Sequence, residues 1–283
     1  MKTKMTPIST RSAITHRVPP KRQEGLTLVE IMIALTLGLI VLLAIGSIYI
    51  GSRQTYRVQE DNARLQEAGR YALEVVGRSI RQAGSDTEMT FNPVAVTTTC
   101  GTAAPCNTIA GTNNASPTPD IMTVQLYAGR DELSGGVWNT RDCTGGLVPS
   151  GTVITNAFDV TGGNLRCTGS QGGVQTLISD VEDFQVVYGI DTTGDQSADR
   201  YVAAPGNWAQ VVTARVCVLV RSANNGLTAA PQRFLNCAGA LGTADATVAG
   251  VGGGLSDAGA GDLRLRRSFV ATYNLRNRVN ATP

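Results

Sequence analysis

Lysine and histidine are scarce in this 283-residue chain. All three lysines and the single histidine, His16, lie within the first 25 residues, so arginine is the only basic side chain beyond that point. A phosphate-binding loop needs a lysine. Ser-His-Asp triads, Cys-His pairs and histidine zinc sites need a histidine. The sequence therefore excludes these chemistries from residues 26–283.

Aromatic residues are also few, at 5%, whereas the chain has 32 glycines, a composition that favours a loop-rich β domain. Residues 26–283 carry 18 arginines and 21 acidic residues, and this net charge of −3 argues against a broad nucleic-acid-binding surface. No carboxylates form a defensible catalytic pair; Asp180, Glu182 and Asp183 precede a predicted strand and are interpreted as a solvated turn. We expect no enzymatic activity and no nucleic-acid partner.

The six cysteines all follow the apolar segment described next, which suggests an oxidising compartment and disulfide bonds. No CxxC pair is present, so a zinc ribbon or a thioredoxin-type redox site is not expected. Pairing of sequence neighbours is our prediction, and buried free thiols are the alternative. The predicted pairs are Cys100–Cys106, Cys143–Cys167 and Cys217–Cys237.

The amino-terminal region combines a basic leader with a long apolar run. The first 25 residues hold six basic side chains against one acid, and Ile31–Ser52 is a run of 22 residues without charge. Such a run is long enough to span a bilayer as a helix, and the basic flank predicts a cytoplasmic leader and a periplasmic or exterior remainder. A secretory signal peptide would have a shorter apolar core. A plain membrane anchor would leave the acidic residue Glu30 unexplained.

The segment "KRQEG-LTLVE" resembles the type IV prepilin processing motif. The resemblance implies that a prepilin peptidase and methyltransferase cuts the leader after Gly25 and methylates the new amino terminus at Leu26. Glu30 is then the fifth residue of the mature chain. The family usually starts its mature chain with Phe or Met, so Leu26 is a departure that bears on methylation more than on cleavage.

Cleavage after Gly25 would give Glu30 a physical role. A free ammonium at Leu26 and a carboxylate at Glu30 are both costly in hydrocarbon, and pairing them between neighbouring subunits offsets part of each cost. Glu30 is therefore predicted to set the stagger between assembled helices. The alternative is a carboxylate that lies at the headgroup level.

A helical pattern continues beyond the apolar run and predicts one helix over Leu26–Ala83, roughly 85 Å long at 1.5 Å per residue. Its second half is amphipathic, and Gly84 is the expected C-cap. The stripe expected to pack on a sheet is Leu65, Ala68, Ala72, Val75, Val76 and Ile80.

The segment "ARLQEAGRYALEVVGRSIRQAG" and the terminal "RRSFVATYNLRNRV" look like the corresponding regions of PilW-like minor pilins. The segments "LISDVEDFQVVYGID" and "VVTARVCVLVRS" agree more loosely. The resemblance implies an α+β, type IV pilin-like fold, in which a long amino-terminal helix packs on an antiparallel β-sheet head with disulfide-containing loops. Predicted strands are Thr123–Tyr127, Val153–Val160, Asp183–Ile190, Gln210–Arg221 and Ser268–Leu275.

Four parts follow: a leader removed after residue 25 (1–25), a transmembrane and assembly half-helix (26–52), an amphipathic half-helix (53–84) and a periplasmic or extracellular β-rich head (85–283). The implied function is that of a minor pilin in a priming or tip complex supporting pilus assembly, twitching motility or adhesion. Its implied partners are other minor pilins, the major pilin and the inner membrane, with the pilus or cell surface as final location. A type II secretion pseudopilin is one alternative.

Another alternative is an adhesin or DNA-uptake pilin, for which the carboxyl-terminal arginines are the hint, although strand alternation divides them between two faces. They are Arg264, Arg266, Arg267, Arg276 and Arg278.

No cofactor is required by this reading, and calcium is the one candidate. In "DTTGDQSADRY", Asp191, Asp195 and Asp199 occupy positions 1, 5 and 9 of a calcium-loop spacing. Gln196 stands where such a loop has glycine, and Val202 where it has a bidentate glutamate. A polar hairpin turn and weak calcium binding are therefore both open.

Overall fold

A computed structural model describes residues 25–85, 108–114, 118–128, 140–149, 152–241 and 255–277. The chain divides into two compact units, Met1–Ser52 and Arg53–Pro283, and each is considered by itself. Helix α1 (Leu28–Gln82) has 55 residues and contributes to both. This helix was predicted over Leu26–Ala83. It is long and apolar enough in its first half to cross a membrane.

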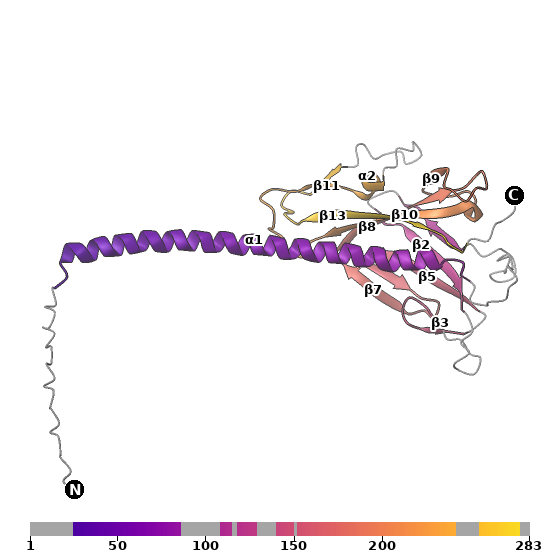
Figure 1. The fold of residues 1–283 in the computed structure, drawn as a ribbon, viewed down its shortest axis with the longest axis horizontal. Helices are drawn as coiled ribbons and strands as arrows, with labels where there is room; N and C mark the ends of the chain where they lie inside the picture. Colours follow the sequence, from indigo (N-terminus) through magenta and orange to yellow (C-terminus); the bar gives the residue numbers. More distant parts are fainter. Residues whose placement is uncertain are drawn as a thin grey trace, which may run out of the picture. The chain divides into compact units, whose positions relative to one another are not determined.

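The second unit contains two antiparallel sheets (Figure 1). The five-stranded sheet has the order β1-β2-β5-β6-β7, and the four-stranded sheet has the order β13-β10-β8-β9. The strands of the first are β1 (Ile109–Thr112), β2 (Ile121–Tyr127), β5 (Val153–Thr161), β6 (Asn164–Thr168) and β7 (Val174–Ser179). Those of the second are β8 (Val181–Ile190), β9 (Arg200–Val202), β10 (Val211–Arg221) and β13 (Arg266–Asn274).

Smaller elements complete the described part of this unit. They are the ribbons β3–β4 (Thr140–Arg141 and Leu147–Val148) and β11–β12 (Arg233–Leu235 and Leu255–Asp257), the 3₁₀ helix η2 (Trp208–Gln210) and the short helix α2 (Cys237–Leu241). All five predicted strands are present, within two residues at each end. Strands β6 and β7 were not predicted, although Gly162 and Gly163, with φ angles of 59° and 76°, form the tight turn from β5 to β6.

The second half of α1 shares one hydrophobic core with both sheets. Four residues of the predicted stripe are buried, and Ala68 and Val75 are partly buried against the same cluster. The buried four are Leu65, Ala72, Val76 and Ile80. Phe158 of β5 and Phe184 of β8 are the largest fully buried side chains they join. The amphipathic period therefore predicted the packed face correctly, because side chains three and four apart share one side of a helix.

Strand β13 holds α1 through aromatic rings and hydrogen bonds. A β-carbon at Gly69 would collide with the ring of Phe269, and one at Gly77 with the ring of Tyr273, so these glycines permit close approach. The Tyr273 hydroxyl donates to the Leu73 carbonyl at 2.7 Å. The Asn277 amide donates to the carbonyls of residues 81 and 83, both at 3.3 Å, and these lie at the helix end, where carbonyls lack helical partners.

One prediction about this unit is wrong. Asp183 is 1% exposed within β8, and Glu182 accepts hydrogen bonds from Arg266 at 2.7 and 2.9 Å, so these carboxylates do not form a solvated turn. Asp180 does lie in the turn between β7 and β8, with a φ of 59°. The partner of Glu182, Arg266, is 84 residues away and is not revealed by local sequence, whereas the Asp183 carboxylate accepts from the nearby Gln185 amide at 2.8 Å.

Candidate functional site

The residues of the predicted processing and assembly site lie at the start of α1. Gly25 and Leu26 precede the helix and are exposed. The Thr27 N–H donates to Oε2 of Glu30 at 3.4 Å, and the Glu30 N–H donates to Oγ1 of Thr27 at 3.3 Å. This reciprocal pair is a capping box, which satisfies two of the amides left without partners at a helix start.

The capping box gives the Glu30 carboxylate a defined position within its own chain. Its charge lies in the first turn of α1, where the helix dipole favours an anion. Thr27 was not predicted as a site residue, although the pattern Thr-x-x-Glu before an apolar run is a recognised capping signal. The structure thus adds Thr27 to the three predicted residues.

Two disulfide bonds fix loops of the second unit: Cys143–Cys167 joins the β3–β4 ribbon to β6, and Cys217–Cys237 joins β10 to α2. They are two of the three pairs that neighbour pairing predicts. Cys100 and Cys106 lie outside the described residues. No cysteine in the described part of the chain is free.

The three aspartates of the candidate calcium loop accept hydrogen bonds from backbone amides of the loop itself. Asp191 accepts hydrogen bonds from the amides of residues 193, 194 and 196, at 3.0, 2.6 and 2.8 Å. Asp199 accepts from the Thr192 amide and hydroxyl, both at 2.6 Å, and these hydrogen bonds lower its pKa. Asp195 accepts from the Ser197 amide at 2.8 Å.

These three carboxylates do not converge. Across the described ranges, no three His, Cys, Asp or Glu side chains are grouped so that they could hold a metal ion. Gln196 nevertheless has a φ of 65°, the left-handed conformation that the glycine of a calcium loop adopts. Calcium binding remains a prediction of the sequence, and a calorimetric titration that releases no heat would remove it.

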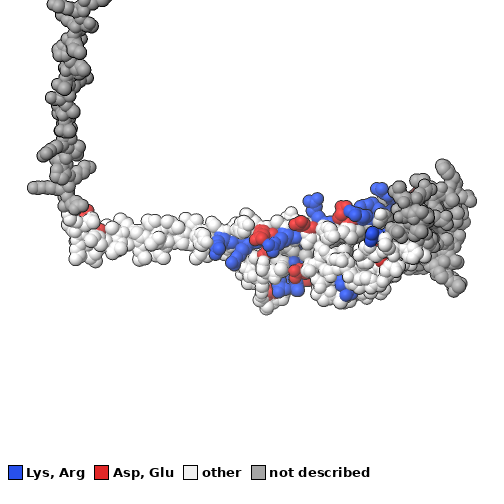
Figure 2. Space-filling model, turned by 90° about the horizontal axis from the view of Figure 1, so that it is seen from below, with Lys and Arg blue, Asp and Glu red and all other residues white. Residues whose placement is uncertain are grey.

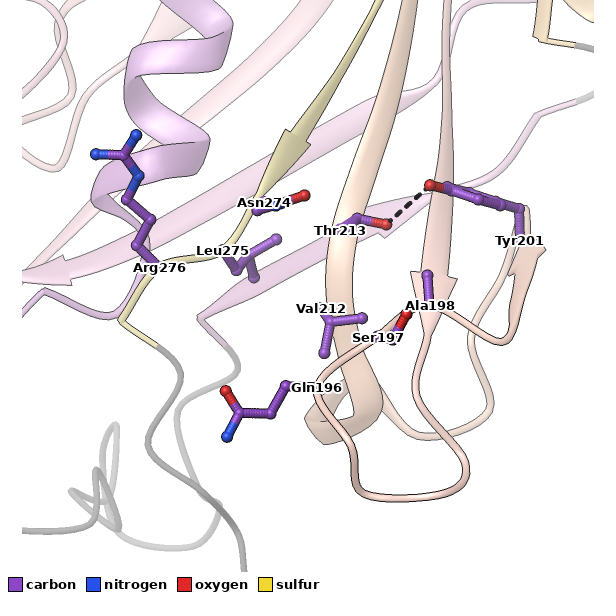
Figure 3. Close-up of a pocket in the computed structure, with 9 residues that line it drawn as sticks. All are labelled: Gln196, Ser197, Ala198, Tyr201, Val212, Thr213, Asn274, Leu275 and Arg276. Carbon is purple, nitrogen blue, oxygen red and sulfur yellow. Dashed lines mark hydrogen bonds between the residues drawn. The ribbon is translucent and has the colours of Figure 1, made fainter.

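An open cleft of about 540 Å³ lies beside this loop (Figure 3). It is lined by Gln196, Ser197, Ala198, Tyr201, Val212, Thr213, Asn274, Leu275 and Arg276. Thr213 and Tyr201 hydrogen-bond to each other at 3.3 Å, and the guanidinium of Arg276 points away from them. The lining residues include no carboxylate, cysteine or histidine, so the cleft offers no general base to activate its hydroxyls.

The carboxyl-terminal arginines do not form one basic surface. The Arg266 side chain is 6% exposed, and it pairs with Glu182 and Asp262. Arg278 lies outside the described residues. On the face shown in Figure 2, basic and acidic side chains are interspersed rather than segregated. This arrangement gives no support to an extended nucleic-acid-binding stripe.

A buried carboxylate joins the two sheets. Asp120, immediately before β2, donates its amide to the Phe184 carbonyl at 2.7 Å and accepts from the Val186 amide through Oδ2 at 2.8 Å. It also accepts from the Asn114 amide at 2.6 Å. Burial, opposed by these hydrogen bonds and reinforced by the charge of Asp183, raises the pKa of Asp120 to about 6.

Comparison with known proteins adds to this geometry. The family model described as type IV pilus-assembly protein W matches residues 157–277. A model of the prokaryotic N-terminal methylation motif matches residues 20–46. The chain is a PilW-like minor pilin.

Two solved structures are remotely similar to this minor pilin. A type IV-like pilin from Thermus thermophilus has 14% identity and a TM-score of 0.35, over 60% of this chain and 83% of that one. A chain of the GspK–GspI–GspJ complex from the enterotoxigenic Escherichia coli type 2 secretion system has 10% identity and a TM-score of 0.35, over 54% and 87%. No curated protein sequence matches the chain.

The residues described above fall in two separate matched regions of this PilW-like pilin. The methylation-motif match contains Gly25, Leu26, Thr27 and Glu30. The PilW match contains Phe269, Tyr273 and Asn277, which attach α1 to the four-stranded sheet. The residues predicted to direct processing and assembly and the residues that hold the helix therefore belong to separate parts of the sequence.

Proposed function

We propose that a prepilin peptidase and methyltransferase cuts this chain after Gly25 and methylates Leu26, and that the mature chain enters a type IV pilus as a low-copy subunit of a priming or tip complex. The observation that carries the proposal is the position of Glu30. It lies five residues beyond Gly25, at the start of an apolar helix, in a chain whose head matches the PilW family.

In the proposed assembly step, Glu30 exchanges one partner for another. Before assembly its carboxylate accepts the Thr27 amide of its own chain, at the long distance of 3.4 Å. The ammonium of a neighbouring subunit's Leu26 is a stronger partner, because it adds the attraction between two opposite charges to the hydrogen bond, whereas the Thr27 amide is neutral. The pair also lessens the cost of placing both charges in hydrocarbon.

The proposed topology follows from the charges that flank the apolar run. The leader, with its six basic residues, stays cytoplasmic, and the head lies in the periplasm before assembly. Other minor pilins, the major pilin and the inner membrane are the proposed partners. Pilus initiation, twitching motility and attachment are the proposed roles.

We assign the chain no catalytic role and no required cofactor. The only nucleophiles at the described cleft are hydroxyls without a neighbouring base, and the chain has neither lysine nor histidine after residue 25. A structural subunit needs neither group.

Mass spectrometry of the protein recovered from sheared pili tests the proposal. We expect a chain that begins at Leu26, carries an N-methyl group and contains the cysteines as disulfides. Recovery of an unprocessed chain that retains residues 1–25 would overturn it. Deletion of the chain should reduce surface pili and leave type II secretion of exoproteins intact; the opposite pair of phenotypes would identify a pseudopilin.

A further inference from the structure

The edge strands of the two sheets differ in how well they are protected against pairing with another strand. An unprotected edge strand presents free N–H and C=O groups to any other strand, and proteins block such edges with short strands, charges, prolines or covering segments. Strands β1 and β9 are short, with four and three residues. Strand β13 carries Arg266 and Arg267, and the Gln232 side chain bonds to the backbone of Arg266 at 2.7 and 3.3 Å.

Within the described residues, strand β7 has one protective feature, a bulge at Leu177 where its pairing with β6 shifts, and this bulge lies beyond the exposed residues 174–176. Its six residues, Val-Gln-Thr-Leu-Ile-Ser, include no charge and no proline. It forms one end of the five-stranded sheet, and among the described strands it pairs with β6 alone. Its first three residues are exposed, and Val174 is 55% exposed, whereas Ile178 is buried and anchors the strand.

We propose that the outer edge of β7 accepts an extended strand from the head of a different pilin subunit in the assembled complex. The proposal rests on the proposed function, because it needs other pilin heads beside this one. Main-chain hydrogen bonds would supply the affinity, and alternate side chains the specificity, as in other cases of strand addition.

The side chains of β7 restrict which kind of strand could pair with it. An uncharged edge has no ion pair to offer, so the added strand should also lack charge opposite Val174 and Thr176. A β-branched or aromatic residue opposite Val174 would cover its exposed side chain, since such cross-strand pairs stabilise sheets. The partner is thus a neutral, β-branched or aromatic strand at a sheet edge of another pilin.

Photocrosslinking in intact cells tests the contact. A benzophenone amino acid replaces Gln175 in the full-length chain, and a matched chain carries it at Arg267, an exposed residue of the protected β13. We expect an adduct from position 175 whose cross-linked peptide maps to an edge strand of another pilin head, with little product from position 267. Adducts only to a second copy of this chain, adducts only to a protein that is not a pilin, or no adduct would each overturn the proposal.

Charge substitution provides a second test with a matched control. Val174→Lys combined with Thr176→Lys should lower incorporation into sheared pili at least tenfold, equivalent to about 1.4 kcal/mol. Val270→Lys, on the 38% exposed Val270 of β13, should leave incorporation unchanged. Equal incorporation of the β7 variant and the wild-type chain would overturn the inference. Absence of the wild-type chain from pili would instead count against the proposed function.

Discussion

The two halves of α1 use glycine in opposite ways. In the first half, no described atom lies within 4 Å of a β-carbon built at Gly38, Gly46 or Gly51. In the second half, the same addition at Gly69 or Gly77 would collide with an aromatic ring of β13. Among the described residues, the glycines of the second half therefore contact a packing partner, whereas the three glycines of the first half do not. We predict that lipid and other subunits pack against the first half.

The largest expected effect comes from the disulfide that secures the four-stranded sheet. Replacing both Cys217 and Cys237 by alanine should lower the free energy of unfolding of the second unit by about 2–4 kcal/mol, because the bond closes a loop with a sequence separation of 20. Urea unfolding of the detergent-solubilised full chain, followed by tryptophan fluorescence, measures it. Cleavage after Gly25 should be unaffected, and a loss of cleavage would contradict the independence of the two halves.

A pair of glycine substitutions compares the halves directly. Gly77→Val should destabilise the second unit by about 1–3 kcal/mol, because the added side chain must displace the Tyr273 ring. Gly46→Val should leave urea unfolding of that unit unchanged. Equal effects of the two substitutions would refute the contrast between packed and unpacked glycines.

A further contribution to the stability of the second unit should depend on pH. The pKa of Asp120 is about 6 when folded and has its ordinary value of 3.8 when unfolded, so the folded chain binds this proton more tightly. Stability from this group is therefore greatest below pH 4 and is lost as the pH rises through 6, by up to about 3 kcal/mol, because each pKa unit corresponds to roughly 1.4 kcal/mol.

Asp120→Asn, compared with the exposed Asp257→Asn, isolates this contribution in urea unfolding between pH 4 and 7.5. Only the Asp120 variant should flatten the profile. A profile that is unchanged by Asp120→Asn would show that burial does not raise this pKa.

The smallest effect should follow from loss of the capping box. Thr27→Ala removes the hydroxyl that accepts the Glu30 amide and should weaken the first turn of α1 by about 1 kcal/mol. Thr27→Ser keeps the acceptor and serves as the control. Hydrogen exchange at residues 28–31 should rise for alanine and not for serine, while exchange in the second unit stays constant.

Local patterns predicted much of this architecture. Apolar periodicity located α1 and its packed stripe, whereas the assembly site at Gly25, Leu26 and Glu30 stays a prediction. The roles of Gly69, Gly77, Glu182 and Asp120 were not predictable, because each depends on a partner distant in sequence. Thr27 was predictable and was overlooked, since its capping signal is local.

Incorporation of Glu30→Ala into sheared pili, measured by quantitative immunoblotting, tests the central claim most directly. The account predicts that this variant is cut after Gly25 and keeps wild-type stability in its second unit, yet is depleted from pili at least tenfold, equivalent to about 1.4 kcal/mol. Incorporation of Glu30→Ala at the wild-type level would contradict the claim that Glu30 pairs with the amino terminus of a neighbouring subunit.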